Sequence, residues 1–426
     1  MTVRTRTAVV CAAAAAAALL AYYLVAWAQV SPLRERGTDF SASYVAAQLV
    51  RDGQGASLYD QRAEHARHVQ QLPPGTVIDL PFITPPTSAL LAMPFTLTDP
   101  GTAFRLWSLC QLALLAVAIV IACRAAPWPR GMHSAVRWGA VALGLAGVAT
   151  FSFLLLGQID GVAALGLAAA YALWRRDRAG WAGFCLALGF AATKPHLAVG
   201  LAVFLVARRD WRAVAGAAMG VAAAVAASLL TAGPAALGGF VSSLIFALGN
   251  TPATSTVGTT GLAASWLGTG GGATAFGLAG SLVALAGCAV LGARSAGRPM
   301  RLEAALAGAL ALSLVASPHV LAHDLVLLAP AFGWCLARAA AADGAAAAWP
   351  GQAAGRLLTG WVGLNLLVDL DTGNSAPAPP GRLVPWALLL AGAAALVACG
   401  LRLPRARLAE LRLQSGSGSG AGGSSE

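Results

Sequence analysis

Apolar runs long enough to cross a lipid bilayer recur along the whole chain, and this feature constrains the fold most. The first covers residues 7–29, and comparable runs occupy 101–123, 212–231 and 274–293. A bilayer core is crossed by roughly 20 apolar residues in an α-helix. Within lipid only helices and closed barrels satisfy their backbone polar groups, and a barrel would alternate apolar and polar residues. The sequence therefore predicts an all-α polytopic membrane protein.

The composition supports a membrane location and argues against a nucleic-acid partner. Of the 426 residues, 58% are hydrophobic and 11% are charged, whereas soluble domains carry about 25% charged residues. The net charge of +11 comes largely from arginines in short loops between apolar runs. This is the placement that the positive-inside rule predicts. The seven cysteines show no metal-binding or disulfide spacing, so we interpret them as small core residues.

Arginine-rich tracts orient the chain across the membrane. The N-terminal "MTVRTRT", the internal "WRRDRAGW" and "RRDWR", and the tail "RLPRARLAELR" fall on one side when the chain is threaded through its apolar runs. Basic loops stay in the cytoplasm, so the opposite helix ends face outward. The threading predicts a multi-pass protein whose site faces the exterior. The Arg/Ala/Gly bias suggests a high-GC bacterium, so the expected location is the bacterial inner (cytoplasmic) membrane, with the site facing the periplasm or exterior.

The threading gives about eleven or twelve membrane helices in one domain, residues 1–413. Residues 30–85 form a first external loop, and residues 232–273 form a second, Gly- and Thr-rich loop. The basic start and apolar centre of the N-terminus also suit a cleaved signal peptide, but the long apolar run favours an uncleaved first helix. The Gly/Ser-rich end, 414–426, is interpreted as a flexible linker or tag remnant.

The first external loop contains the stretch "RGTDFSASYVAAQLV", which places an acid close to a membrane helix. Residues 40–51 have the apolar spacing of an amphipathic helix, with Asp39 at its N-cap. A carboxylate is favoured at a helix N-terminus, so Asp39 can both cap the helix and serve a site. A second helix is predicted over 61–71, capped by Asp60. Both helices are expected to lie on the membrane surface.

The least expected polar motifs all fall on the external side of this threading. They are Asp39, "GQID" (157–160), "TKPH" (193–196) and "SPHVLAH" (317–323). Ionisable groups near the hydrocarbon core are costly and usually mark functional sites. Their convergence predicts one cavity at the outer membrane surface.

The order and spacing of these motifs resemble glycosyltransferase family 87. The stretches that carry the resemblance are "DFSASYVAAQLV…GASLYD", "TPPTSALLAMPF", "LLLGQIDG", "AATKPHLAVGL…ARRDWRA" and "SPHVLAHDLVLLAP". The resemblance covers most of the chain and is weakest over 213–300 and after 340. Ile83-Thr84 stands where family members often have an aromatic residue, and 250–273 matches no family motif. The resemblance implies the GT-C membrane fold.

The resemblance also implies an activity. It implies a hexosyltransferase that moves a sugar, mannose in similar enzymes, from a polyprenyl phosphate to a lipid-anchored glycan at the external face, with inversion. It implies an aspartate base in the first external loop, which maps onto Asp39. Such a transfer needs a base for the acceptor proton and donors for the departing phosphate. Asp160 is the alternative base, and it also suits a helix cap or a partner between helices.

Lys194 is predicted to contact the donor phosphate. It is the only lysine in a chain whose other basic residues are arginines. The run 181–207 is short for two spans and is interrupted at Lys194-Pro195, which predicts two short helices meeting at the proline. Broken helices commonly form binding sites in membrane proteins. The alternative is a lysine that snorkels to the interface.

His319 and His323 are further predicted phosphate contacts, with His323 ahead of His319. Their spacing of four places both on one face of a helix. A metal site is the weaker interpretation, because no third ligand stands at a fixed spacing, and no cofactor is expected. Arg36 could contact the phosphate or hold the Asp39 carboxylate.

Five residues are predicted to line the substrate site: Tyr44, Tyr59, Gln158, Asp160 and His196. Tyr59 equally suits a packing role, and Gln158 equally suits a tie between helices. The expected partners are the polyprenyl-phosphate sugar, the lipid-linked acceptor and membrane lipids, with the protein acting as a monomer.

The rival function is a transporter or flippase for lipids or polyisoprenoid-linked sugars. Broken helices and buried polar groups suit that class too. Against it, the sequence contains no inverted repeat that we can detect, and the polar motifs cluster on one face rather than at the bilayer midplane.

Overall fold

The computed structural model describes residues 3–31, 37–71, 80–250, 253–343, 350–372 and 383–400, and these residues form helices and connecting turns without any strand. In chain order the α-helices are α1 (Val3–Ala28), α3 (Asp39–Arg51), α4 (Gln61–Gln71), α5 (Pro86–Ala92), α6 (Pro100–Ala125), α7 (Ser134–Leu145), α8 (Val148–Leu156), α9 (Asp160–Trp174), α10 (Ala179–Ala191), α11 (Val199–Arg208), α12 (Trp211–Asn250), α13 (Thr259–Leu267), α14 (Gly271–Ser295), α15 (Leu302–Ala316), α16 (Leu328–Asp343), α17 (Gln352–Thr372) and α18 (Val384–Gly400).

The prediction of an all-α polytopic membrane protein is confirmed. Within the described ranges six helices are long and apolar enough to cross a membrane, or seven if the bent pair α7–α8 is one span. Four further apolar helices are shorter. These assignments rest on length and composition, so the predicted number of eleven or twelve crossings stays a prediction.

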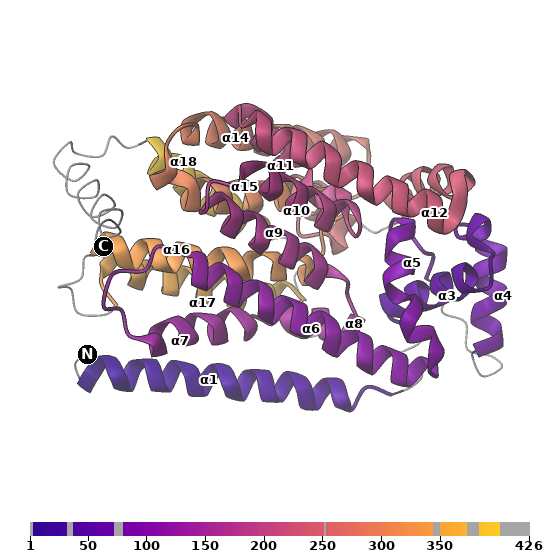
Figure 1. Ribbon diagram of the computed structural model, residues 1–426, viewed down its shortest axis with the longest axis horizontal. Coiled ribbons are helices and arrows are strands. Elements are labelled where there is room, and N and C mark those ends of the chain that lie inside the picture. Colours follow the sequence, from indigo (N-terminus) through magenta and orange to yellow (C-terminus); the bar gives the residue numbers. More distant parts are fainter. Residues whose placement is uncertain are drawn as a thin grey trace, which may run out of the picture.

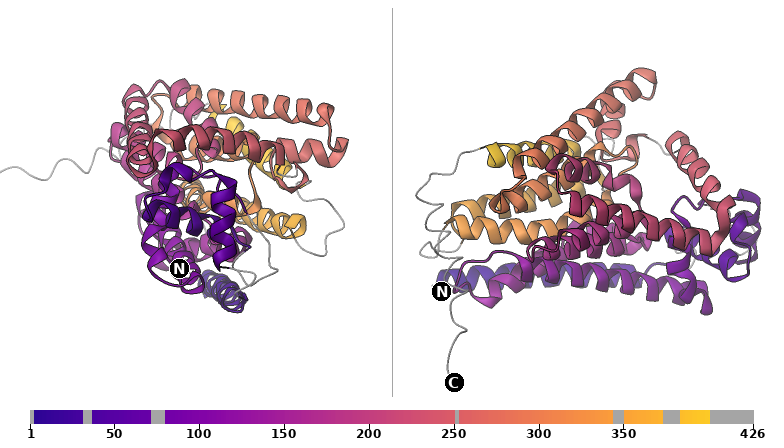
Figure 2. Two further views of the ribbon diagram at one scale, coloured as in Figure 1. Left: turned by 90° about the vertical axis from the view of Figure 1, so that its right-hand side faces the viewer. Right: turned by 45° about the horizontal axis from the view of Figure 1, so that its top comes forward.

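The helices form an elongated bundle with a separate group of helices at one end. α1 begins and α18 ends at the left-hand end in Figure 1, while α3, α4 and α5 lie together at the opposite end. We call these three helices the external cap. Figure 2 shows the cap from its own end, lying over the bundle rather than within it. Since the basic tracts lead into the left-hand helix ends, the cap lies at the end that the threading places outside.

Most predicted helices appear within a few residues of their expected limits. The break at Lys194-Pro195 is confirmed, because α10 and α11 are separated by the short 3-10 helix η3 (Pro195–Ala198). The cap helices α3 and α4 also appear as predicted. Asp60 caps α4, since its Oδ1 accepts a hydrogen bond from Arg62 N at 2.9 Å.

Two local predictions need correction. The N-cap of α3 is Thr38, and Asp39 is the first helical residue. Its carboxylate contacts Gln158, in the turn between α8 and α9, instead of capping its own helix. The stretch 232–273 is largely helical, because α12 continues to Asn250 and α13 follows. α12 bends at Gly233, whose φ of 75° favours glycine. Pro234 then suits the first turn of the second half.

The segment between α3 and α4 of the cap packs against α12 on both sides of its bend through small residues. A Cβ on Gly55 would lie 2.7 Å from the Cα of Ala232, and one on Gly239 would lie 2.7 Å from the Tyr59 ring. Leu58 and Phe82 are buried in the same apolar cluster. Close backbone approach of this kind excludes larger side chains, so it fixes the position of the cap.

Candidate active site

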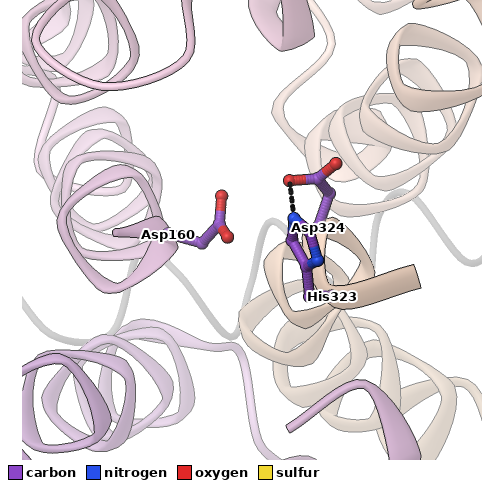
Figure 3. Close-up of side chains that lie close together, drawn as sticks. All are labelled: Asp160, His323 and Asp324. Atoms are coloured by element: carbon purple, nitrogen blue, oxygen red, sulfur yellow. Dashed lines mark ion pairs between the residues drawn. The ribbon is translucent and has the colours of Figure 1, made fainter. Parts of the chain in front are cut away.

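Two carboxylates from distant parts of the chain lie near each other inside the bundle (Figure 3). Asp160 begins α9, and Asp324 lies in the short 3-10 helix η6 (Ala322–Leu327). Both side chains are buried, with exposed fractions of 0% and 1%. Two buried carboxylates repel each other and are costly to remove from water, so this pair requires a cation.

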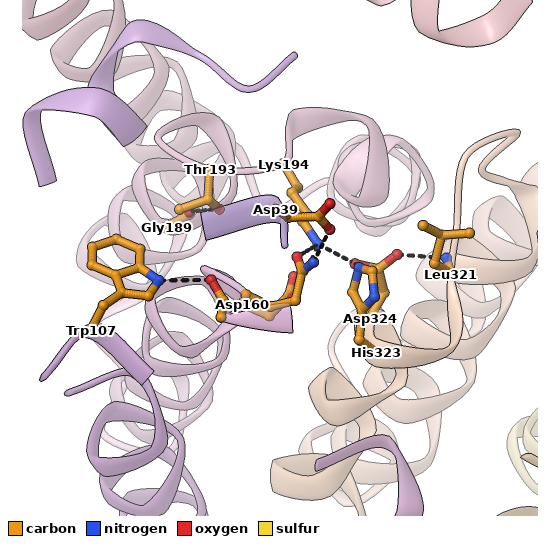
Figure 4. Close-up of polar contacts among 11 residues, drawn as sticks. Asp39, Trp107, Asp160, Gly189, Thr193, Lys194, Leu321, His323 and Asp324 are labelled. Atoms are coloured by element: carbon orange, nitrogen blue, oxygen red, sulfur yellow. Dashed lines mark hydrogen bonds and ion pairs between the residues drawn. The ribbon is translucent and has the colours of Figure 1, made fainter. Parts of the chain in front are cut away.

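Lys194 supplies that cation (Figure 4). Its Nζ donates hydrogen bonds to Asp324 Oδ1 at 2.6 Å, Asp160 Oδ2 at 3.0 Å and Gln158 Oε1 at 2.9 Å. An ammonium group has three donors, so all three are in use. Lys194 itself is buried. Ion pairs at this depth persist only when they are well hydrogen-bonded, and this arrangement meets that condition.

The turn before α9 presents Gln158 and Asp160 to the lysine. α8 ends at Gly157 in the left-handed conformation, with φ 61°. This C-cap reverses the chain direction. A Cβ on Gly157 would lie 2.7 Å from the Cβ of Phe40, and Trp107 Nε1 donates to the Gly157 carbonyl at 2.8 Å. Glycine is therefore required both for the turn and for the contact with α3.

Asp324 has both carboxylate oxygens engaged, since its Oδ2 accepts from Leu321 N at 2.7 Å. His323 Nε2 lies 3.5 Å from Asp324 Oδ1. Ligand atoms of Asp160, His323 and Asp324 all lie within 4.8 Å of one another, close enough to share a metal ion. Lys194 Nζ already contacts both carboxylates, so a divalent ion would have to displace the ammonium.

Gln158 connects this buried cluster to Asp39. Its Nε2 donates a hydrogen bond to Asp39 Oδ2. The Lys194 ammonium can only donate, so it takes the amide oxygen of Gln158 and leaves the amide nitrogen for Asp39. Unlike Asp160, Asp39 is only half-buried. Asp39 is therefore the carboxylate that a substrate can reach.

The environment of Asp39 acts on its acidity in both directions. Burial raises the pKa of the carboxyl above its ordinary value, while the Lys194 charge and the Gln158 hydrogen bond oppose this rise. A raised pKa makes the ionised carboxylate a stronger base.

Two half-buried histidines, His196 and His319, lie together, and His319 is close enough to Asp39 for their charges to interact. The rings of His196 and His319 meet edge to face, with centroids 5.9 Å apart. His196 Nε2 and His319 Nδ1 have no hydrogen-bond partner among the residues that the structure describes. Burial lowers the pKa of His319, which keeps the ring neutral at pH 7 with one N–H to donate. His323, in contrast, is buried.

Not every predicted residue joins this group. The Tyr44 hydroxyl donates to the Thr98 carbonyl, and the Tyr59 hydroxyl donates to the Thr84 carbonyl, each at 2.7 Å. Both hydroxyls therefore already donate to backbone carbonyls. A substrate contact for either tyrosine stays a prediction. Arg36 lies outside the described residues.

Sequence reasoning missed Asp324 as a member of the cluster. The available signal was an acid inside the apolar run "LAHDLVLLAP", because such residues are rare in membrane segments. It also missed Thr87 and Ser88, whose hydroxyls both donate to the Ala192 carbonyl, at 2.8 and 3.1 Å. These bonds tie α5 of the cap to the turn that carries Lys194.

The comparisons with known proteins give one match. The family model of glycosyltransferase family 87 matches residues 82–318. No curated protein and no solved structure matches the chain significantly. The matched range includes Gln158, Asp160 and Lys194, while Asp39 and Asp324 lie outside it.

Proposed function

The chain belongs to glycosyltransferase family 87 and is a multi-pass membrane protein, and we propose that it moves a hexose, in the first instance mannose, from a polyprenyl phosphate to a lipid-anchored glycan. The transfer takes place at the external face, and the anomeric configuration is inverted. The observation that carries the proposal is the half-buried Asp39 carboxylate, joined through Gln158 to the buried Lys194 cluster.

Asp39 acts as the general base. The acceptor hydroxyl oxygen forms the new bond to the anomeric carbon as the bond to the phosphate oxygen breaks, and Asp39 takes the hydroxyl proton. Asp160 suits this role poorly, because it is fully buried and ion-paired with Lys194. Since Gln158 occupies Oδ2 of Asp39, the acceptor hydroxyl is assigned to Oδ1.

His319 and His196 contact the departing phosphate. Each has one buried ring nitrogen, His196 Nε2 and His319 Nδ1, without a hydrogen-bond partner among the described residues. A neutral imidazole N–H stabilises the negative charge that develops on the leaving oxygen. The sequence predicted that Lys194 contacts the donor phosphate, but its three donors are already in use. We therefore assign it a different role. It contributes a fixed positive charge and orients Gln158.

The placement of the site at the cap end supports external transfer. The arginine tracts predict that this end faces away from the cytoplasm, and the cap helices lie where a surface-bound acceptor lipid would approach.

Transfer is expected to be insensitive to EDTA. The carboxylates that could bind a divalent ion are neutralised by Lys194, and a single phosphate leaving group has no diphosphate to chelate. The measurement is the initial rate after EDTA treatment and dialysis. Loss of activity that Mg²⁺ or Mn²⁺ restores would show that a metal assists.

Gln158→Leu is expected to slow transfer about 10- to 100-fold, because a hydrogen bond to a charged group contributes roughly 1.5–3 kcal/mol. Asp39 would lose its orienting donor, and Lys194 would lose one acceptor. Gln111→Leu is a matched control, because Gln111 is also a buried membrane glutamine but is not among the hydrogen-bond partners of Asp39 or Lys194 in the described structure. Equal loss in both variants would indicate a general packing effect.

The proposed function is tested with the purified protein in proteoliposomes. Labelled polyprenyl-phospho-mannose and bacterial membrane lipids are supplied, and labelled glycolipid is separated by chromatography. We expect label to appear in a glycolipid. Label that crosses the bilayer while still attached to polyprenyl phosphate would favour the transporter.

A further inference from the structure

The Thr- and Gly-rich segment 256–261 lies against the loop that carries His319. Val257 N donates to the Val320 carbonyl at 2.9 Å. Thr260 Oγ1 donates to the Pro318 carbonyl at 3.3 Å. The residues immediately before and after His319 are therefore both held by this segment.

Gly258 brings the two backbones together. A Cβ at this position would lie 2.7 Å from the Ser317 carbonyl oxygen, 3.0 Å from that of Val315 and 3.0 Å from Val320 Cγ1. The backbone of Gly258 is ordinary and extended, with φ −103°. Any residue can adopt this conformation, so glycine is needed here for space and not for conformational freedom.

The segment is itself fixed to the bundle. The hydroxyls of Thr259 and Ser281 on α14 lie 2.8 Å apart and form a buried hydrogen bond. The hydroxyls of Thr256 and Thr260 are 3.2 Å apart. Val257 and Thr256 are both about 1% exposed. Because the segment is buried and hydrogen-bonded, its position determines the position of the His319 loop that packs against it.

We propose that residues 256–261 form a seat that positions the His319 imidazole against the donor phosphate. The inference rests on the proposed function for the identity of that ligand. The loop needs such support, because it joins α15 to η6 without regular helical hydrogen bonds around His319. The seat explains a Gly- and Thr-rich stretch in a membrane protein, since Gly258 allows the close approach and the Thr260 hydroxyl bonds a loop carbonyl.

Gly258→Ala tests the seat, with Gly272→Ala as its control. A Cβ on Gly272 meets nothing within 4 Å. We expect Gly258→Ala to increase hydrogen exchange in residues 317–321 and to lower kcat/KM for the donor about 100-fold, as small misplacements of catalytic groups do. Gly272→Ala is expected to leave both unchanged. If Gly258→Ala does not fold, Thr260→Val removes the bond to the Pro318 carbonyl and the contact with the Thr256 hydroxyl, and it is expected to cost roughly 2- to 10-fold.

The His319→Ala background separates positioning from general damage. A residue that acts through His319 loses its effect when the imidazole is gone. We therefore expect Gly258→Ala to change kcat/KM less than about twofold in that background. An equal loss with and without His319 would overturn the seat, and so would unchanged exchange of 317–321 in Gly258→Ala. If the native protein transfers no sugar, the proposed function fails, while the exchange measurement still decides whether the segment holds the loop.

Discussion

Asp39→Asn is expected to lower the rate of sugar transfer by about 10²–10⁴-fold, the usual contribution of a general base. Asparagine keeps the size of the side chain but cannot take the acceptor proton. Folding is expected to survive, because Asp39 is half-buried at the first turn of α3 and makes no ion pair in the described structure. The measurement is the initial transfer rate at saturating donor, together with the thermal unfolding temperature in detergent.

Asp52→Asn is the matched control for this variant. Asp52 is the C-cap of α3, at the opposite end of the helix from Asp39. It pairs with Arg67 on α4. The same substitution there is expected to leave transfer unchanged. An Asp39→Asn protein that transfers at the native rate would contradict the assignment of the base.

Lys194→Met is expected to destabilise the protein by about 3–5 kcal/mol, because it leaves two buried carboxylates without their cation. It is also expected to move the acid limb of the kcat/KM profile to higher pH. Burial raises the pKa of Asp39, and the charged or titratable groups that face it are Lys194 and His319, which lower this pKa, and Asp324, which raises it.

The direction of the pH shift follows from these signs. The base must be ionised, so activity falls as pH drops through the pKa of Asp39. Removing Lys194 removes the main charge that lowers this pKa, so the fall begins at a higher pH. Arg178→Met, which removes an exposed cation elsewhere, is the control. An acid limb that stays in place or moves to lower pH would contradict the role of Lys194.

The helices were predictable from sequence because their causes are local. Apolar runs of spanning length, the proline after Lys194 and the amphipathic spacing after Asp39 each determine structure within a few residues. The predicted end of the helix at residue 231 was wrong, because α12 continues to Asn250. The backbone departs from helical geometry only at Gly233, and a second helical stretch begins directly at Pro234.

The site was predictable only in part. Threading brought Asp39, Gln158 and Lys194 to one face, because helix ends on the same side of a membrane are neighbours. It could not show which atoms would meet. The pairing of Lys194 with Asp324 joins residues 130 positions apart, and it depends on how helices pack rather than on spacing. For the same reason Asp39 was expected to cap its helix, while the structure turns it toward Gln158.

The central claim is that Asp39 removes the acceptor proton, and chemical rescue tests it most directly. Asp39→Ala leaves space at the accessible side of the cluster, and formate is a small carboxylate that can enter it. We predict that Asp39→Ala transfers sugar to the glycolipid acceptor only when formate is added, with a rate that rises with formate concentration. Transfer by Asp39→Ala at the native rate without formate would contradict the claim.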